Sequence, residues 1–232
     1  MKVESCAYSL SLGGKAVGTQ VFRTGSHGRT TLLEARVLWQ GVFGQQSLTQ
    51  RSQIKSRTGE SLRFNEEVEG KSDKHTFEVV FDAETALVRA TRRSGNQLDS
   101  SDTPYLRPYS DPLGLLHTLR GRTDESSIRI PMLGKDVVAE RLADAEVETG
   151  LGIRNATPFV LYPGPSYVYF DKDEPHTILK LIQPTVHGML EAYLTRISFE
   201  ESTLSGPAQN TPKKNENKRR RRGGRRRKRA PN

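Results

Sequence analysis

Apolar and polar residues alternate through most of the first 92 positions of the chain. The alternation has a period of two in residues 5–12 and again in residues 32–39, which predicts strands with one buried face. We expect five more strands in this half of the chain, at Ala16–Arg23, Gln46–Lys55, Ser61–Glu69, Thr76–Asp82 and Ala86–Arg92. Short polar or glycine-containing turns separate these segments, with no helical pattern between them, so they indicate an antiparallel meander. Its apolar face has to curl around other parts of the chain or be covered by them.

The alternation stops after Arg93, where the polar residues 94–104 predict a loop. A helix is expected directly after this loop. Asp111 is a good N-cap, Pro112 suits the first helical position, and the leucines from Leu113 to Leu119 form an apolar stripe that ends at Gly121. A helix of this length is suited to covering an open sheet.

The pattern of strands resumes after the helix and continues to about residue 201. The expected strands are Ser127–Met132, Val137–Leu142, Ala145–Thr149, Phe159–Tyr162, Tyr167–Phe170, Thr177–Ile182 and Leu190–Phe199. The sequence therefore predicts a mainly β domain over residues 1–201, built as a single curved antiparallel sheet or open half-barrel with one short helix. Residues 202–232 are nearly free of apolar side chains, and we expect a disordered linker and tail there.

The tail differs sharply from the rest of the chain in charge. Residues 213–229 contain 12 Lys or Arg and one acid, Glu216, a formal charge of +11, whereas the whole chain carries +9. The first 212 residues therefore carry −2, and the basic character of the protein belongs to its tail.

A segment of this composition is typical of electrostatic binding to nucleic acid. Arginine outnumbers lysine, and its planar guanidinium suits phosphate oxygens and stacks on bases. We expect binding by phosphate contacts without sequence specificity, with RNA favoured over DNA. Adhesion to a membrane surface is a weaker alternative, because no apolar anchor adjoins the basic run. The predicted nucleic-acid-binding residues are Lys213, Lys214, Lys218, Arg219, Arg220, Arg221, Arg222, Arg225, Arg226, Arg227, Lys228 and Arg229.

The rest of the composition narrows the class of protein. One cysteine, Cys6, excludes an intrachain disulfide. The first residues lack the apolar run of a secretory signal, and no stretch approaches the ~20 apolar residues of a membrane span. These features predict a cytoplasmic protein without a membrane span.

Three segments together resemble the DUF3108-like family, bacterial proteins of unknown function. They are the strand–turn–strand Tyr8–Gly18, the helix Asp111–Arg120 and the strand pairing Leu161–Val168. The resemblance covers most of residues 4–200 and implies a curved antiparallel sheet or open half-barrel. Members of that family are typically exported envelope proteins. This chain departs from the pattern by lacking a leader and by having a polybasic end, and the resemblance supplies no catalytic residues.

No arrangement of side chains in the sequence predicts catalysis. The cluster Asp173–His176 could hold a metal but equally fits a solvated turn, and His117 fits a packing role on the helix better than that of a general base. Cys6 lies on an apolar strand face, where an inert thiol is expected. The glycine-rich segments lack the spacing of a phosphate-binding loop. We therefore expect a non-enzymatic protein without a cofactor.

Two roles remain open for the predicted β domain, residues 1–201, which we call the β body. Basic residues on neighbouring strands, such as Arg51 and Arg63, could contact single-stranded nucleic acid, but acids interleave with them, which favours an ordinary mixed surface. A half-barrel closed by the helix could instead hold an apolar cavity for a lipid or acyl chain, but a filled core is the favoured interpretation. The sequence thus predicts a nucleic-acid-associated adaptor whose body contacts a protein or an apolar ligand, and alternatively a carrier of an apolar ligand or envelope component.

Overall fold

The computed structural model describes residues 1–70, 74–201 and 203–207. Its helices are the 3-10 helix η1 (Gly41–Phe43) and the α-helix α1 (Pro112–Arg120). Its strands are β1 (Lys2–Leu12), β2 (Lys15–His27), β3 (Thr30–Trp39), β4 (Gln46–Lys55), β5 (Ser61–Gly70), β6 (Lys74–Asp82), β7 (Leu87–Ser94), β8 (Gln97–Pro104), β9 (Ser127–Met132), β10 (Lys135–Arg141), β11 (Ala145–Thr149), β12 (Gly152–Tyr162), β13 (Ser166–Asp171), β14 (Ile178–Thr185) and β15 (Gly188–Glu201).

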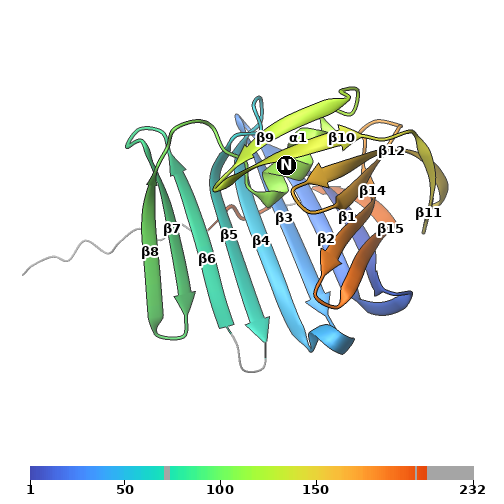
Figure 1. Cartoon of the computed structure of the whole chain (residues 1–232), viewed down its shortest axis with the longest axis horizontal. Coiled ribbons are helices and arrows are strands. Elements are labelled where there is room, and N and C mark those ends of the chain that lie inside the picture. Colours follow the sequence, from blue (N-terminus) through green and yellow to red (C-terminus); the bar gives the residue numbers. More distant parts are fainter. Residues whose placement is uncertain (71–73, 202, 208–232) are drawn as a thin grey trace, which may run out of the picture.

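All of these strands belong to one antiparallel sheet. Hydrogen bonding runs in the order β8-β7-β6-β5-β4-β3-β2-β1-β15-β14-β13-β12-β10-β9, with β11 paired to β12 beside β10. The first and last strands of the chain therefore meet in the middle, where β1 pairs with both β2 and β15. The strands β2 to β8 form one wide wall and β9 to β14 curl back beside it, with α1 between them (Figure 1).

This arrangement confirms the predicted fold class, a mainly β open half-barrel with one short helix. The two ends of the sheet, β8 and β9, do not pair with each other, so the barrel stays open along a seam. The chain crosses this seam through residues 105–126, which include α1, and one isolated bridge links Ser110 to Met132.

One prediction was wrong in a way that matters for the seam. Residues 97–104, expected as a polar loop, form the edge strand β8, and every residue in it is exposed. Because both faces of β8 meet solvent, its side chains show no alternation that could identify a strand. Asp99, Asp102 and Pro104 discourage pairing with a further strand at this edge.

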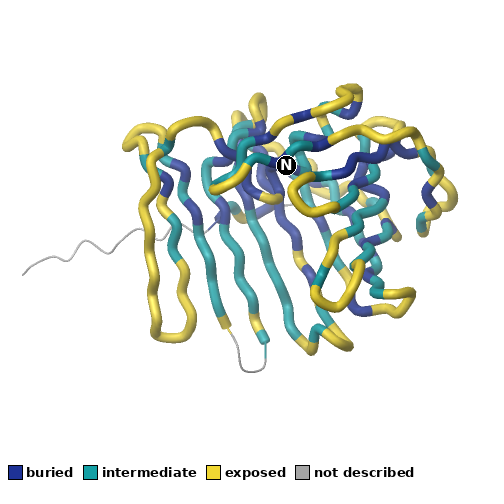
Figure 2. Tube along the Cα trace, in the orientation of Figure 1, coloured by how far each residue is buried: buried dark blue, intermediate teal, exposed yellow. Residues whose placement is uncertain are grey.

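The core lies on the concave face and is densest beneath α1. Phe159, Phe170, Leu33, Ile54 and Leu119 are among its fully buried side chains. Figure 2 shows burial concentrated near the ends of the strands where α1 lies, whereas the opposite ends of β4 to β6 are half-buried. The helix therefore fills only part of the concave face.

A second, small cluster lies on the convex face. Leu204, in the segment that follows β15, is buried against Val3 and Leu32 and sits over Gly25. Gly25 leaves room for it, because a Cβ there would lie 3.2 Å from a methyl carbon of Leu204. The segment expected as a linker is thus packed onto β1 to β3 at its start.

Candidate functional site

The concave face forms a trough with an apolar lining. Directly opposed residues of an antiparallel pair share a face of the sheet, and Leu10, Ala192 and Leu181 are opposed in this way across β1, β15 and β14. The period-two pattern of the sequence therefore places its apolar positions inside the curve.

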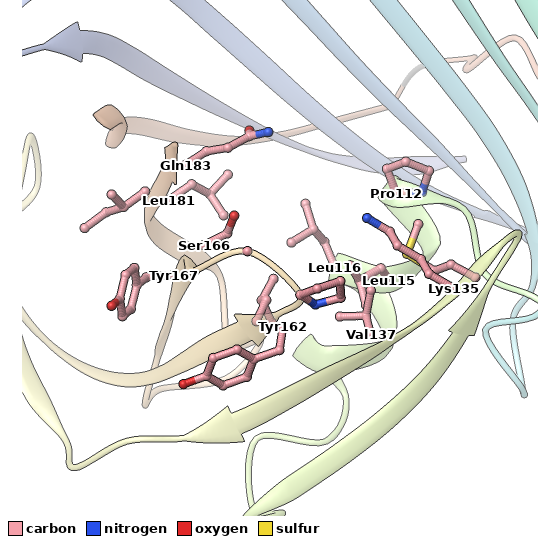
Figure 3. Close-up of a pocket in the computed structure, with 15 residues that line it drawn as sticks. Pro112, Leu115, Leu116, Lys135, Val137, Tyr162, Ser166, Tyr167, Leu181 and Gln183 are labelled. Atoms are coloured by element: carbon pink, nitrogen blue, oxygen red, sulfur yellow. The ribbon is translucent and has the colours of Figure 1, made fainter. Parts of the chain in front are cut away.

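Three adjoining hollows occupy the part of the trough that α1 does not fill, with volumes of about 290, 320 and 310 Å³. The first lies between α1, β10, β14 and the turn from β12 to β13 (Figure 3). The second lies over β5 and β6 and shares Pro112 and Met132 with the first. The third lies over β1 to β4 and shares Leu181 and Gln183 with the first. Cavities of this size that are mostly apolar are typical of small-ligand sites.

Few charged groups reach the hollows. The first contains Lys135 at the β9–β10 turn, with Ser166 and Gln183 as further polar groups. The second contains Glu66, which accepts a hydrogen bond of 2.8 Å from the Gln50 side chain, and Asp111. No charged residue lines the third. The trough is thus suited to an apolar chain with a limited number of polar contacts.

Asp111 fixes the start of α1 to the sheet. Its Oδ2 accepts hydrogen bonds from the hydroxyls of Ser52 (2.5 Å) and Ser61 (2.6 Å), and its Oδ1 accepts from the backbone N–H groups of Leu113 and Gly114 (both 2.9 Å). Burial raises the pKa of this carboxyl, and the four hydrogen bonds oppose that rise. Asp111 is thereby a structural N-cap, as its sequence position predicts.

The other end of α1 is held by a half-buried ion pair. Arg120 donates from Nη1 and Nη2 to the two carboxylate oxygens of Glu4, at 2.5 and 2.9 Å, and from Nε to the Pro175 carbonyl at 2.6 Å. The Thr177 hydroxyl donates to the same carboxylate at 3.0 Å. Such a bidentate pair fixes both position and orientation, so the helix is tied to β1 and to the segment before β14.

His117 and Cys6 lie near this pair in packing positions. Burial, with the nearby Arg120 charge, lowers the pKa of His117. Burial and the Glu4 charge raise the pKa of the Cys6 thiol to about 12, which removes its nucleophilic form at neutral pH. These positions agree with the packing role that the sequence favoured for His117 and the inert thiol that it favoured for Cys6.

The predicted alternative at Asp173–His176 is a turn in the structure. Asp173 pairs with Arg154 at 3.0 Å, and the His176 Nδ1 lies 3.0 Å from the backbone carbonyl of Asp171. Within residues 1–70, 74–201 and 203–207, no group of three or more His, Cys, Asp or Glu side chains is arranged to hold a metal ion.

The convex face carries most of the charged side chains, and acids offset the bases there. Glu34 lies among Arg23, Arg36 and Arg51, with the closest nitrogen–oxygen separations being 3.7, 3.0 and 3.1 Å. Arg63 pairs with Glu78 on the neighbouring strands. This pairing is that of a mixed solvated surface, and it leaves little net positive charge for phosphate.

The predicted nucleic-acid-binding residues, Lys213 to Arg229, lie outside the described residues. The last described segment, 203–207, leads towards them from the convex face, near the start of β1. In the part of the chain that the structure describes, no helix is long and apolar enough to cross a membrane.

No family model matches the chain, and no curated protein matches it. A solved structure does: a beta-barrel-like protein of the domain of unknown function DUF1849 from Brucella abortus. The match has a TM-score of 0.55 at 8% identity and covers 86% of this chain and 98% of that one. What the two proteins share is the fold. At this identity the similarity extends to no residue or activity.

The sequence left an apolar cavity in the half-barrel open as an alternative to a favoured filled core, and it did not identify the residues that line the hollows. Trp39, Phe43 and Leu48 line the third hollow, and Leu116 and Leu181 line the first. Each is a half-buried apolar residue of an otherwise regular pattern. The pattern identifies the face on which they lie, but only the curvature of the sheet decides which of them stay uncovered.

Proposed function

We propose that the β body binds an apolar ligand, such as an acyl chain, in the trough. The observation that supports this is the row of three adjoining, mostly apolar hollows on the concave side of the sheet. The edge strands β8 and β9 do not pair, and α1 does not fill the concave side. Residues shared between neighbouring hollows show that each hollow adjoins the next.

The expected affinity follows from the area that such a chain removes from water. Each buried methylene contributes ~0.8 kcal/mol, so affinity rises about fourfold for each added carbon. The rise ends when the chain is longer than the trough. The test is displacement of an environment-sensitive apolar dye by a series of fatty acids of increasing length. A constant affinity along the series would contradict the proposal.

The junction between the first and third hollows offers a specific variant. Leu181 lines both hollows and is half-buried, so Leu181→Trp fills the junction without deleting a core group. We expect this variant to lose more affinity for the longer fatty acids than for the shorter ones. Leu151→Trp is the matched control, because Leu151 is exposed in the turn between β11 and β12 and lines none of the three hollows.

The tail supports a second function, electrostatic binding of nucleic acid with RNA ahead of DNA. The supporting observation is the charge difference between the tail, at +11, and the rest of the chain. We expect the affinity of the full-length protein for RNA to fall steeply with salt, because each neutralised phosphate releases condensed counterions. Replacing the 12 tail bases by Gln in the full-length chain should remove most of the affinity and of the salt slope. Unchanged binding by that variant would exclude the tail as the site.

We further propose that the protein is non-enzymatic, cytoplasmic and DUF3108-like in its body. The buried thiol of Cys6 and the packed imidazole of His117 support the first of these. The segments Tyr8–Gly18, Asp111–Arg120 and Leu161–Val168 support the last. Fractionation of cells that produce the protein tests its location.

A further inference from the structure

One end of the trough is framed by two turns that touch across it. Residues 40–45, which include η1, join β3 to β4, and residues 186–187 join β14 to β15. The rings of Phe43 and His187 lie 5.3 Å apart, edge to face, and Trp39 packs on Phe43 at 4.7 Å. Because β2, β1 and β15 separate β3 from β14 in the sheet, this contact shows how tightly the sheet curls at the end of the third hollow.

The tips of these turns are apolar and exposed. Val42 is 60% exposed and Val186 is 96% exposed, next in sequence to the two rings that touch. Residues 13–15, 41–45 and 185–188, which form the turns at this end of β1 to β4, β14 and β15, include no acid and one base, Lys15. We call Val42 and Val186 the apolar tips.

We infer that the apolar tips dock on the surface of a lipid bilayer, so that an apolar ligand passes between the membrane and the third hollow. The inference rests on the proposed binding of an apolar ligand. The partition coefficient of a free acyl chain between water and an apolar phase falls about fourfold for each methylene that enters water. Direct contact between the apolar tips and the bilayer avoids this unfavourable transfer through water. Trp39 and Phe43, which line the third hollow, connect the tips to it.

A bilayer suits the shape of this end better than a protein does. A stable protein interface buries about 800 Å² on each partner, far more than two separate valine tips supply. Apolar side chains on a polar surface can insert ~5–10 Å into the boundary between headgroups and acyl chains. The absence of acids from the turns 13–15, 41–45 and 185–188 favours approach to a neutral or anionic surface.

The position of the last described segment, residues 203–207, is compatible with this docking. The segment that leads to the tail packs on Val3, at the start of β1, and the apolar tips lie beyond Leu12, at its end. Leu204 and the apolar tips therefore lie at opposite ends of β1, so the packed segment 203–207 leaves the apolar tips uncovered.

The experiment measures transfer of a fluorescent fatty acid between the full-length protein and vesicles of phosphatidylcholine, which carry no net charge and so give the basic tail little attraction. We expect the transfer rate to rise with vesicle concentration, because transfer occurs on collision. The double substitution Val42→Asp and Val186→Asp should slow transfer at least tenfold and remove this dependence. Leu106→Asp is the matched control, because Leu106 is 81% exposed on the segment between β8 and α1, and it should transfer at the wild-type rate.

Two further measurements separate the possible failures. Affinity for the fluorescent fatty acid in solution should be unchanged in all variants; if the wild-type protein does not bind it, the proposed ligand function is wrong. Flotation with ligand-free vesicles tests docking by itself, and we expect the wild type and the Leu106 variant to float but not the double variant. The milder pair Val42→Ser and Val186→Ser repeats the comparison if the aspartates reduce folding.

The docking inference fails under any of three results: wild-type protein that does not float, transfer that is independent of vesicle concentration, or a double variant that behaves as the wild type. Sedimentation without vesicles gives one more check. If the double substitution changes the association state of the protein, the apolar tips are an interface between copies of the chain, and bilayer docking is wrong.

Discussion

Removing the Asp111 carboxylate should destabilise the fold at the point where α1 joins the sheet. In Asp111→Ala, the backbone N–H groups of Leu113 and Gly114 lose their acceptor. The hydroxyls of Ser52 and Ser61, both fully buried, lose theirs as well. The helix covers part of the core, so its loosening affects the first two hollows of the trough.

The magnitude can be built from these contacts. Loss of an N-cap costs ~1 kcal/mol, and each buried hydroxyl left without an acceptor costs ~1 kcal/mol or more. The Ser61 oxygen still accepts from the backbone N–H of residue 111. The variant also relieves the burial of a charge, since burial is the main cause that raises the pKa of Asp111. We take this relief to be smaller than the losses, because Asp111→Ala removes all four hydrogen bonds that the carboxyl accepts. We expect a net loss of ~3 kcal/mol in the free energy of unfolding, a large share of the 5–15 kcal/mol typical of a domain.

The assay is urea unfolding of wild type, Asp111→Ala, Ser61→Ala and the double variant. The two changes should couple, so that the double variant loses less than the sum of the single losses. A loss below ~1 kcal/mol for Asp111→Ala, or strictly additive losses, would refute the argument that this network stabilises the fold.

The pH dependence of Asp111 has a definite sign. Its folded pKa is raised above the ordinary value of 3.8, so the native state holds this proton over a pH range in which the unfolded chain has released it. The stabilising contribution is therefore present below 3.8 and is lost as pH rises through the folded pKa. Asp111→Asn, which keeps an acceptor for the helix, should lack this loss. A wild type that gains stability relative to the Asn variant on raising the pH would contradict the sign.

Three further predictions concern single positions. Gly59→Ala should lower the free energy of unfolding more than the control Gly28→Ala. Both glycines have φ above +60°, but a Cβ at Gly59 would lie 2.3 Å from the Thr118 hydroxyl oxygen, whereas Gly28 has open space. We expect a loss of ~1 kcal/mol for the control and roughly twice that or more for Gly59, measured by denaturant unfolding. Cys6 should react with a thiol reagent only when the protein unfolds, because its pKa of about 12 leaves almost no thiolate at neutral pH; fast labelling of the native state would be inconsistent with this. His117, whose pKa burial lowers from 6.5, should make the protein less stable as pH falls from 6.5 through the folded pKa, and His117→Gln should flatten that part of the stability profile.

Much of the fold was predictable because most strands have one apolar face. Period two is visible in β1, where buried and half-buried positions alternate from Cys6 to Leu10, and in the second half of β3, where the buried Ala35 and Val37 alternate with exposed positions. The cap at Asp111 marks the helix because few residues other than Asp, Asn, Ser and Thr satisfy free N–H groups. The alternation disappears where both faces have the same environment. In β8 both faces are exposed, and in β12 residues 156–160 are buried in succession, so its extent back to Gly152 was not predicted.

The candidate site was less predictable than the fold. The three hollows exist because the sheet curls until Phe43 meets His187, which are 144 positions apart in the sequence, and because β8 and β9 stay apart. Both depend on contacts between distant segments, which periodicity does not report. The tail is the opposite case, since its charge is fully visible in the sequence and it lies outside the described residues.

The open seam between β8 and β9 has a consequence for the shape of what the protein can accept. In a closed barrel, the number and stagger of the strands fix the bore, and a guest has to thread it end first. Here, in the part of the chain that the structure describes, residues 105–126 bridge the two edges, with the Ser110–Met132 contact among them. Under the proposed binding of an apolar ligand, a long molecule would enter the trough sideways, with bulky groups left outside at either end.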